Sequence, residues 1–385
     1  MKKTVYYWSP CLTHVGTIKS TLNSSIALAK YNTNYEVTLL NVFGEWTPFT
    51  NYLNNNGVKV INLSFYFKNF LPKYGFFQSR FSYVLIFLIS FFPLLILLKK
   101  KKPDYIIAHL VTSLPLSLFN LFKFKTKLIL RISGYPKLNY LRKKFWHLSS
   151  NKISKITCPT NELMMDLINK NIFQKNKVFI LYDAILNIKD FNKKTQIKTP
   201  NPSSLSIDNF FLSVGRLTKQ KNYFYLLKEF KKFHEKNPSE SLLILGDGEL
   251  RKQIEKLIHK LNLKNCVFLI GHTENVYYFM KKAKAFILPS LWEEVGFVIV
   301  EAALSNALII SSDCKNGPTE LLNNGKGGIL YKSNQMNALF NALNNFLEIR
   351  SSKNYLSKLK IAKKNCKKFS LLNHHIVLTS KILRS

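Results

Sequence analysis

Two carboxylates in an apolar stretch are the strongest candidates for chemistry in this sequence. Glu293 and Glu301 lie eight residues apart, and most of the residues between and after them are apolar. Glutamate is almost never fully buried unless its charge is paired. In one interpretation Glu301 pairs with a lysine or caps a backbone group. In the other, both carboxylates accept hydrogen bonds from a hydroxyl-rich ligand such as a sugar-nucleotide, and the spacing alone leaves both interpretations open.

The residues around this pair predict the elements that would position it. Residues 285–288 are an apolar run typical of a buried strand, and Pro289 follows them directly. Gly296 permits a tight turn into a helix over residues 297–304, and residues 307–310 form a second apolar run. This is a βαβ pattern, and parallel sheets bind ligands at the carboxyl ends of their strands. Glu293 lies at that position.

A second candidate site is a basic loop that follows a predicted strand over residues 210–214. The loop begins with Gly215 and carries Arg216 and Lys221 before the next predicted helix. A phosphate can bind at such a helix N-terminus, where Arg offers a bidentate fork and Lys a point charge. The alternative is solvated surface charge, which suits Lys219 better than Arg216.

Composition indicates a globular protein with room for two domains. The chain has 385 residues, 46% of them apolar and 20% charged, and a formal net charge of +36. Such a charge suggests anionic partners such as nucleic acid, lipid or acidic small molecules, or else a biased genome. The basic excess is spread over the chain and no zinc-finger, RNP or homeodomain pattern occurs, so a nucleic-acid partner is not expected.

In the N-terminal half, candidate residues follow two predicted strands. A first strand over residues 4–7 leads into a loop that contains His14 and Gly16. His109 directly follows another strand over residues 105–108. An ordinary βα turn and a structural histidine are the alternatives to a role in ligand binding.

Residues 81–98 carry no charge and are followed by four lysines, Lys99 to Lys102. The length suits a transmembrane helix. However, Pro93 interrupts the run, and a strand of the same sheet is predicted directly after it, at residues 105–108. We therefore expect a helix that packs on the sheet and touches an anionic membrane surface along one edge. A fully buried core helix is the alternative.

The five cysteines (Cys11, Cys158, Cys266, Cys314 and Cys366) are widely spaced, which predicts reduced thiols in the cytoplasm and neither disulfides nor a zinc site. The N-terminus lacks the apolar core of a signal peptide. Pro and Ser residues near position 200 indicate a linker. We predict an N-terminal domain over residues 1–190, a linker at 191–208, a second domain at 209–365 and a terminal helix at 366–385.

Several of these motifs together resemble family 4 of the retaining glycosyltransferases, which have the GT-B fold. The resemblance rests on Glu293 and Glu301 as an E-x7-E element, on G-R-L-x-x-x-K at residues 215–221, and on Gly246-Asp247-Gly248. In the commonest family form Gly-Phe directly follows the first glutamate, whereas here Gly296-Phe297 come two residues later. The x7 spacing favours Glu293 over Glu294.

The resemblance implies an α/β fold of two Rossmann-like domains that face each other across a cleft, with the last helix returning to the first domain. It implies no metal or other cofactor, with Arg216 and Lys221 as ligands of the diphosphate. The residues that it assigns to catalysis are Glu293 and His109. Those that it assigns to donor binding are Gly16, Arg216, Lys221, Gly271, Gly296, Phe297 and Glu301.

The expected function is transfer of a sugar from a nucleotide-sugar to a saccharide or lipid-linked acceptor, with retention, in the synthesis of capsule, lipopolysaccharide or exopolysaccharide. The expected location is the cytoplasm, at the inner face of the plasma membrane. Three alternatives remain: a nucleotide-sugar 2-epimerase of the same fold, a basic nucleic-acid-binding protein and an inactive scaffold. The epimerases lack the combination of G-R-L-x-x-x-K with E-x7-E, and the intact glutamate pair argues against a scaffold.

Overall fold

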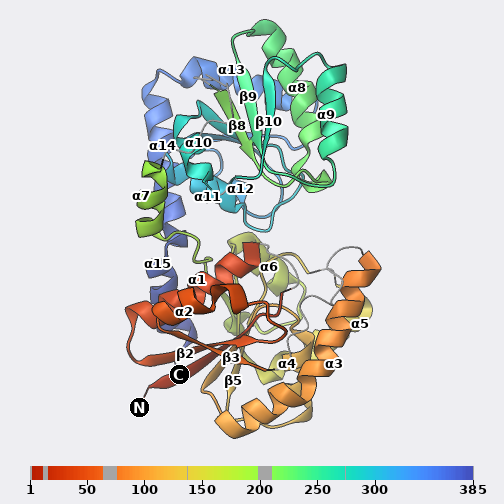
Figure 1. The fold of residues 1–385 in the computed structure, drawn as a ribbon, viewed down its shortest axis with the longest axis vertical. Coiled ribbons are helices and arrows are strands. Elements are labelled where there is room, and N and C mark those ends of the chain that lie inside the picture. Colours follow the sequence, from red (N-terminus) through yellow and green to blue (C-terminus); the bar gives the residue numbers. More distant parts are fainter. Residues whose placement is uncertain are drawn as a thin grey trace. The chain divides into compact units, whose positions relative to one another are not determined.

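The computed structural model describes residues 2–11, 16–63, 76–136, 138–197, 210–273 and 275–384. The chain divides into two compact units. Unit 1 comprises Met1–Ile185 with Phe369–Ser385, and unit 2 comprises Leu186–Lys368. In both units strands and helices alternate along the chain, as Figure 1 shows.

Unit 1 is built on a seven-stranded sheet in the order β3-β2-β1-β4-β5-β6-β7, with every pairing parallel. Parallel sheets are covered on both faces, which is why these strands read as apolar runs. The strands are β1 (Lys3–Trp8), β2 (Tyr35–Asn41), β3 (Val58–Asn62), β4 (Tyr105–Ala108), β5 (Lys127–Arg131), β6 (Ile153–Cys158) and β7 (Val178–Ile180).

Two apolar clusters cover the two faces of this sheet. Alternate residues of β1 point to opposite faces. Tyr6 and Trp8 join the cluster that includes residues of α3, α4, α5 and α6, whereas Val5 and Tyr7 join the cluster of α1 and the C-terminal segment. The helices are α1 (Gly16–Tyr31), α2 (Thr50–Asn55), α3 (Phe76–Lys101), α4 (Ser113–Leu121), α5 (Tyr140–Ser149), α6 (Asn161–Asn169) and α15 (Leu371–Val377).

The C-terminal segment is bound to unit 1 by buried polar contacts as well as by apolar packing. On α15, His374 Nδ1 lies 2.6 Å from the Tyr182 carbonyl oxygen and its Nε2 lies 2.7 Å from Ser24 Oγ. Tyr105 Oη donates to the carbonyl oxygen of Leu383. The last residues of the chain therefore complete the α1 face of the unit 1 sheet.

Unit 2 has a six-stranded parallel sheet in the order β10-β9-β8-β11-β12-β13. The two parallel sheets with interleaved helices confirm the predicted α/β class. The strands are β8 (Phe210–Val214), β9 (Ser241–Leu245), β10 (Val267–Gly271), β11 (Ala285–Leu288), β12 (Leu308–Ser312) and β13 (Ile329–Tyr331). The helices are α7 (Ile188–Gln196), α8 (Tyr223–Lys236), α9 (Arg251–Lys260), α10 (Val276–Lys282), α11 (Phe297–Leu304), α12 (Pro318–Leu321), α13 (Ala338–Ile349) and α14 (Lys353–Cys366).

Helix α7 occupies part of the region that composition predicts to be a linker. It packs on α10, where the Phe191 ring lies edge-on to Tyr277 at 5.0 Å and Asn275 Nδ2 donates to the Lys194 carbonyl oxygen. The nine residues of α7 are polar apart from Ile188 and Phe191, so their composition indicates a linker and not a helix. The Pro-rich remainder, residues 198–209, lies outside the described residues.

Each sheet has one point at which the strand order reverses. In unit 1 it lies between β1 and β4, and in unit 2 between β8 and β11. On either side of such a point the connections leave in opposite directions, which opens a crevice at the carboxyl ends of the two strands. These two junctions are where the fold favours ligand binding.

Candidate functional site

In unit 2 the β8–β11 junction brings together residues that lie 72 positions apart in the chain. Lys221 Nζ lies 2.5 Å from Glu293 Oε1, and Ser290 Oγ donates to the same oxygen at 2.6 Å. Glu293 is 7% exposed and the Lys221 side chain 13%. The Lys221–Glu293 contact therefore joins a residue of the predicted phosphate loop to the first glutamate of the predicted pair.

The loop after β8 is held by close backbone packing against the loop after β9. Gly246 has a φ of +134°, and a Cβ at that position would lie 2.0 Å from the carbonyl oxygen of Gly215. A Cβ on Gly248 would lie 2.6 Å from the Leu217 oxygen. The loop presents Arg216, which is exposed and has no side-chain hydrogen bond or ion pair with a described residue. Its guanidinium is available to an anion from solvent.

The loop after β11 is held in the same way by the segment that precedes α12. Asn316 is completely buried and its Nδ2 donates to the Glu294 carbonyl oxygen. A Cβ on Gly317 would lie 2.0 Å from the carbonyl oxygen of Val295. This clamp fixes the backbone so that the Glu293 side chain is buried while that of Glu294 is exposed.

The remaining unit 2 candidates lie on α11 and on β10. Gly296, with a φ of +84°, precedes α11, and Phe297 is its first residue. Glu301 lies one turn further on, where Tyr277 Oη donates to Oε1 at 3.4 Å. Burial and the Glu301 charge raise the pKa of Tyr277, so the phenol stays protonated. Gly271 ends β10, the edge strand, which β9 separates from β8, so it lies away from the junction.

In unit 1 His109 lies at the β1–β4 junction, directly after β4. It is 7% exposed, and its Nδ1 lies 3.2 Å from Thr21 Oγ1, which is itself 3.1 Å from Ser9 Oγ. Burial lowers the pKa of His109 well below its usual value, and the charges of Arg131 and His374 lower it further. The imidazole is therefore neutral, with one ring nitrogen that can donate a hydrogen bond and one that can accept. Gly16 is the first residue of α1, and His14 lies outside the described residues.

Four buried polar residues near these two junctions were not predicted from the sequence: Arg131, Asp183, Ser20 and Ser290. Arg131, at the end of β5, donates from Nη2 to Asp183 Oδ1 at 2.5 Å, and Ser20 donates to the same oxygen. Arg131 and Asp183 are 2% exposed and lie 52 positions apart. The sequence feature that could have indicated this contact is an arginine directly after the apolar centre of β5, residues 128–130. In unit 2 the corresponding omission was Ser290, whose hydroxyl holds Glu293.

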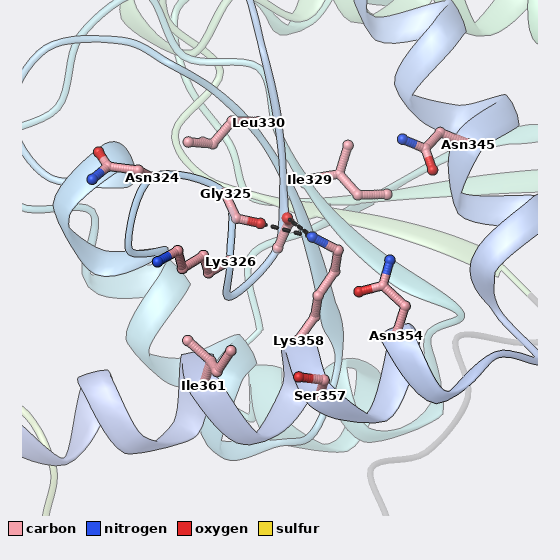
Figure 2. Close-up of a pocket in the computed structure, with 11 residues that line it drawn as sticks. Asn324, Gly325, Lys326, Ile329, Leu330, Asn345, Asn354, Ser357, Lys358 and Ile361 are labelled. Carbon is pink, nitrogen blue, oxygen red and sulfur yellow. Dashed lines mark hydrogen bonds between the residues drawn. The ribbon is translucent and has the colours of Figure 1, made fainter.

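A cavity of about 560 Å³ lies elsewhere in unit 2, between the turn before β13 and the helices α13 and α14, as Figure 2 shows. Lys358 donates to the carbonyl oxygens of Gly325 and Gly328, so its ammonium group ties α14 to that turn. Asn345 and Asn354 line the cavity from α13 and α14. None of the predicted site residues lines it, and Lys358 has a structural role here.

Within the described ranges, no group of three His, Cys, Asp or Glu residues is placed to hold a metal ion. All five cysteines are buried, and none of them forms a disulfide bond. The charged groups at the β8–β11 junction include two cations, Arg216 and Lys221, and the carboxylate of Glu293.

Residues 196–365 match the family described as glycosyl transferases group 1. The family resemblance is confirmed for this part of the chain. An uncharacterised glycosyltransferase of Methanocaldococcus jannaschii is 32% identical over 253 residues, which cover 60% of this chain and 61% of that relative. A Campylobacter jejuni α-1,4-N-acetyl-D-galactosaminyltransferase, whose name gives a diNAcBac-PP-undecaprenol-linked acceptor, is 28% identical over 83% of each chain.

The fold is shared with solved glycosyltransferases. The crystal structure of Anabaena HepE in complex with UDP and glucose has a TM-score of 0.70 to this chain. The comparison covers 99% of each chain at 16% sequence identity. At that identity the likeness shows the fold alone.

Proposed function

We propose that the protein is a retaining glycosyltransferase that transfers a sugar from a nucleotide-sugar to a saccharide or lipid-linked acceptor. The observation that carries the proposal is the Lys221–Glu293 contact at the β8–β11 junction, with Arg216 exposed on the same loop. A diphosphate needs cations, and a sugar with several hydroxyls needs an acceptor such as a carboxylate. The junction offers both.

The reaction separates charge between the sugar and the leaving diphosphate, and the two cations would stabilise the negative charge of the diphosphate. When the bond between the sugar and the nucleotide breaks, negative charge grows on the departing diphosphate. Arg216 and Lys221 would stabilise it, Arg216 as a bidentate donor and Lys221 as a point charge. This arrangement needs no metal ion, and we propose that none takes part.

The positive part of the transition state lies on the sugar ring, where oxocarbenium character develops. A carboxylate at Glu293 would stabilise that charge and hold the sugar hydroxyls. Glu301 would bind the ribose hydroxyls of the nucleotide. His109, neutral because of its burial, would hydrogen-bond the transferred sugar. Gly16, Gly296 and Phe297 are proposed only to shape the surroundings of the donor. For Gly271, which lies away from the β8–β11 junction, we propose no contact with the transferred sugar.

The acceptor and the pathway are proposed by analogy with the relatives. The Campylobacter jejuni enzyme is named for an undecaprenol-linked acceptor, and HepE was crystallised with UDP and glucose. We therefore favour a UDP-sugar donor and a lipid-linked acceptor in the synthesis of a cell-surface polysaccharide. Because such an acceptor stays in the bilayer, the enzyme would work at the inner face of the plasma membrane.

The comparisons do not favour the alternatives. The matched family and both relatives are named as glycosyltransferases. This argues against a 2-epimerase and against a nucleic-acid-binding protein. The nucleic-acid alternative can also be tested by measuring how binding to nucleic acid depends on salt, because binding to a phosphate backbone weakens steeply as the salt concentration rises.

A thermal-shift panel of UDP-, GDP- and ADP-sugars tests the donor. A ligand present at a hundred times its Kd stabilises the folded protein by about 2.7 kcal/mol. We expect stabilisation by one nucleotide and its sugars, with UDP favoured. Proton NMR of the product, which reads the anomeric configuration, tests retention. No stabilisation by any of the panel would contradict the proposal.

A further inference from the structure

Helix α3 has an outer face that the described part of unit 1 leaves uncovered. Residues 81–98 of this helix are uncharged and almost entirely apolar. On the outer face, large apolar residues recur every three or four positions and therefore form one line along the helix. Each of them is 50–67% exposed. This line, the α3 stripe, consists of Phe81, Val84, Leu88, Phe92 and Ile96.

The opposite face of α3 is part of the protein core. Ile86, Leu94 and Leu98 are at most 2% exposed and belong to the cluster that covers one face of the unit 1 sheet. A helix that crosses a bilayer would have to leave this cluster and expose it. A core helix, however, should be buried on every side, whereas only 28% of the apolar segment of α3 is buried. Both observations are met when α3 stays on the sheet and turns only its stripe outward.

The part of the sequence that contains the stripe is strongly basic. Residues 46–161 contain eighteen Lys and Arg residues and a single acidic residue, Asp104. Exposed Lys99, Lys100 and Lys101 form the last turn of α3. Helix α4 contacts both α3 and α5. Helix α5 adds the exposed apolar residues Tyr140 and Leu141 and then, in sequence order, exposed Arg142, Lys143 and Lys144.

We propose that the α3 stripe docks in the plane of an anionic lipid bilayer, with the stripe in the acyl boundary and Lys99–Lys101 among the headgroups. An apolar face beside a basic one is the combination that binds such an interface. The anionic bilayer is identified as the partner because its headgroups complement the charge of the lysines and its acyl chains can cover the exposed apolar stripe. The inference deepens the proposed function, on which it rests for the lipid-linked acceptor that would bring the enzyme to a membrane.

The first experiment measures co-sedimentation of the full-length protein with phosphatidylcholine vesicles containing about 30 mol% phosphatidylglycerol. The test variant is Leu88→Gln/Phe92→Gln. The matched control is Met336→Gln/Leu356→Gln, which removes two apolar side chains that are 76% and 57% exposed in unit 2. We expect binding at least tenfold weaker for the stripe variant and unchanged for the control. Any protein with a net charge of +36 is attracted to anionic vesicles, so the uncharged substitutions are decisive.

A second pair of variants tests the lysines at the end of α3. Lys99→Gln/Lys100→Gln/Lys101→Gln removes three charges beside the stripe. Lys252→Gln/Lys256→Gln/Lys260→Gln removes three exposed charges from α9 in unit 2. The two variants have the same net charge. We expect the α3 variant to bind at least several-fold more weakly than the α9 variant.

Several results would overturn the proposal. Equal vesicle binding by the stripe variant and its control would remove the stripe as the contact. Membranes that retain the protein after carbonate extraction would indicate a span. A dimer that forms without vesicles and is lost in Leu88→Gln/Phe92→Gln would identify a second copy as the occupant. The proposed function is tested separately, since thermal stabilisation by UDP needs no membrane and should be the same in the stripe variant.

Discussion

Lys221 Nζ lies 2.5 Å from Glu293 Oε1, so the predicted phosphate ligand is paired with the predicted catalytic carboxylate. Both side chains are largely buried, where an unpaired charge would be costly. A bound donor would offer Lys221 a second anion, the diphosphate, and would offer Glu293 the hydroxyls of the sugar. The contact therefore holds both side chains in place at the β8–β11 junction.

Arg216 is expected to contribute directly to nucleotide binding, because its exposed guanidinium has no partner among the described residues. Arg216→Ala should weaken UDP binding by about 1.5–3 kcal/mol, the usual contribution of a charged hydrogen bond. Calorimetric titration of UDP measures this. Lys219→Ala is the control, since it removes an exposed cation from the same loop. Equal UDP affinity in both variants would remove Arg216 from the site.

Ser290 is expected to position Glu293. The hydroxyl is completely buried and donates to Glu293 Oε1 at 2.6 Å. Ser290→Ala should remove about 1 kcal/mol of that support and lower kcat roughly fivefold while leaving the affinity for UDP near that of the wild type. Steady-state release of UDP from the donor, combined with calorimetry, separates the two effects. A weaker affinity for UDP with normal kcat would instead assign Ser290 to nucleotide binding.

Gly246 is expected to be essential for the fold of unit 2. Gly246→Ala would place a Cβ 2.0 Å from the Gly215 oxygen at a φ of +134°, so the loops after β8 and β9 would have to separate. We expect a loss of roughly 3 kcal/mol or more in the free energy of unfolding. Gly325→Ala is the control, because its φ of +87° is unfavourable but the nearest atom is an ordinary 3.9 Å away. It should cost about 1 kcal/mol, and similar losses in the two urea titrations would contradict the packing argument.

His374 should make the stability of unit 1 depend on pH. Its burial on α15 lowers its pKa to about 4, whereas an unfolded histidine titrates near 6.5. Between these values the unfolded state binds more protons, so stability is complete above about pH 6.5 and decreases as the pH falls towards 4. His109 and His375 also have lowered pKa values and act in the same direction.

The substitution His374→Asn keeps a donor for the Tyr182 carbonyl oxygen but cannot titrate in this range. It should flatten the decrease in stability between pH 6.5 and 4 by up to about 1.4 kcal/mol for each unit of lost pKa shift. Denaturant titrations at several pH values measure this slope. The control is His147→Asn, an exposed histidine on α5. A slope as steep in His374→Asn as in His147→Asn would contradict the assignment.

The sequence predicts those parts of the structure that depend on local pattern. The strand at residues 285–288 and the helix at residues 297–304 have the predicted bounds, because apolar runs and Gly296 define them locally. The pairing of Lys221 with Glu293 was not predictable, since it depends on β8 and β11 being neighbours in the sheet. The outward face of α3 was not predictable either, because a helix that is apolar all round gives no sign of which side is buried.

Buried partners from distant parts of the chain were missed for the same reason. Arg131 and Asp183 lie 52 positions apart and meet because the parallel strands β5 and β7 have their carboxyl ends at the same end of the sheet. Helix α7 was missed because its contacts with α10 are tertiary, and its own sequence is polar. In both cases the structure depends on contacts between distant residues, which a local sequence pattern does not show.

The most direct test of the proposed chemistry compares glutamine substitutions at the three glutamates, with folding checked by circular dichroism. Glu293→Gln keeps the shape and loses the charge, so it should mainly lower kcat for donor cleavage, as expected for an interaction that is stronger in the transition state. Glu301→Gln should mainly raise KM for the donor, because ribose contacts persist from the ground state to the transition state. Glu294→Gln should stay near the wild type, since that side chain is exposed. A near-normal kcat for Glu293→Gln together with a collapsed kcat for Glu294→Gln would contradict the account.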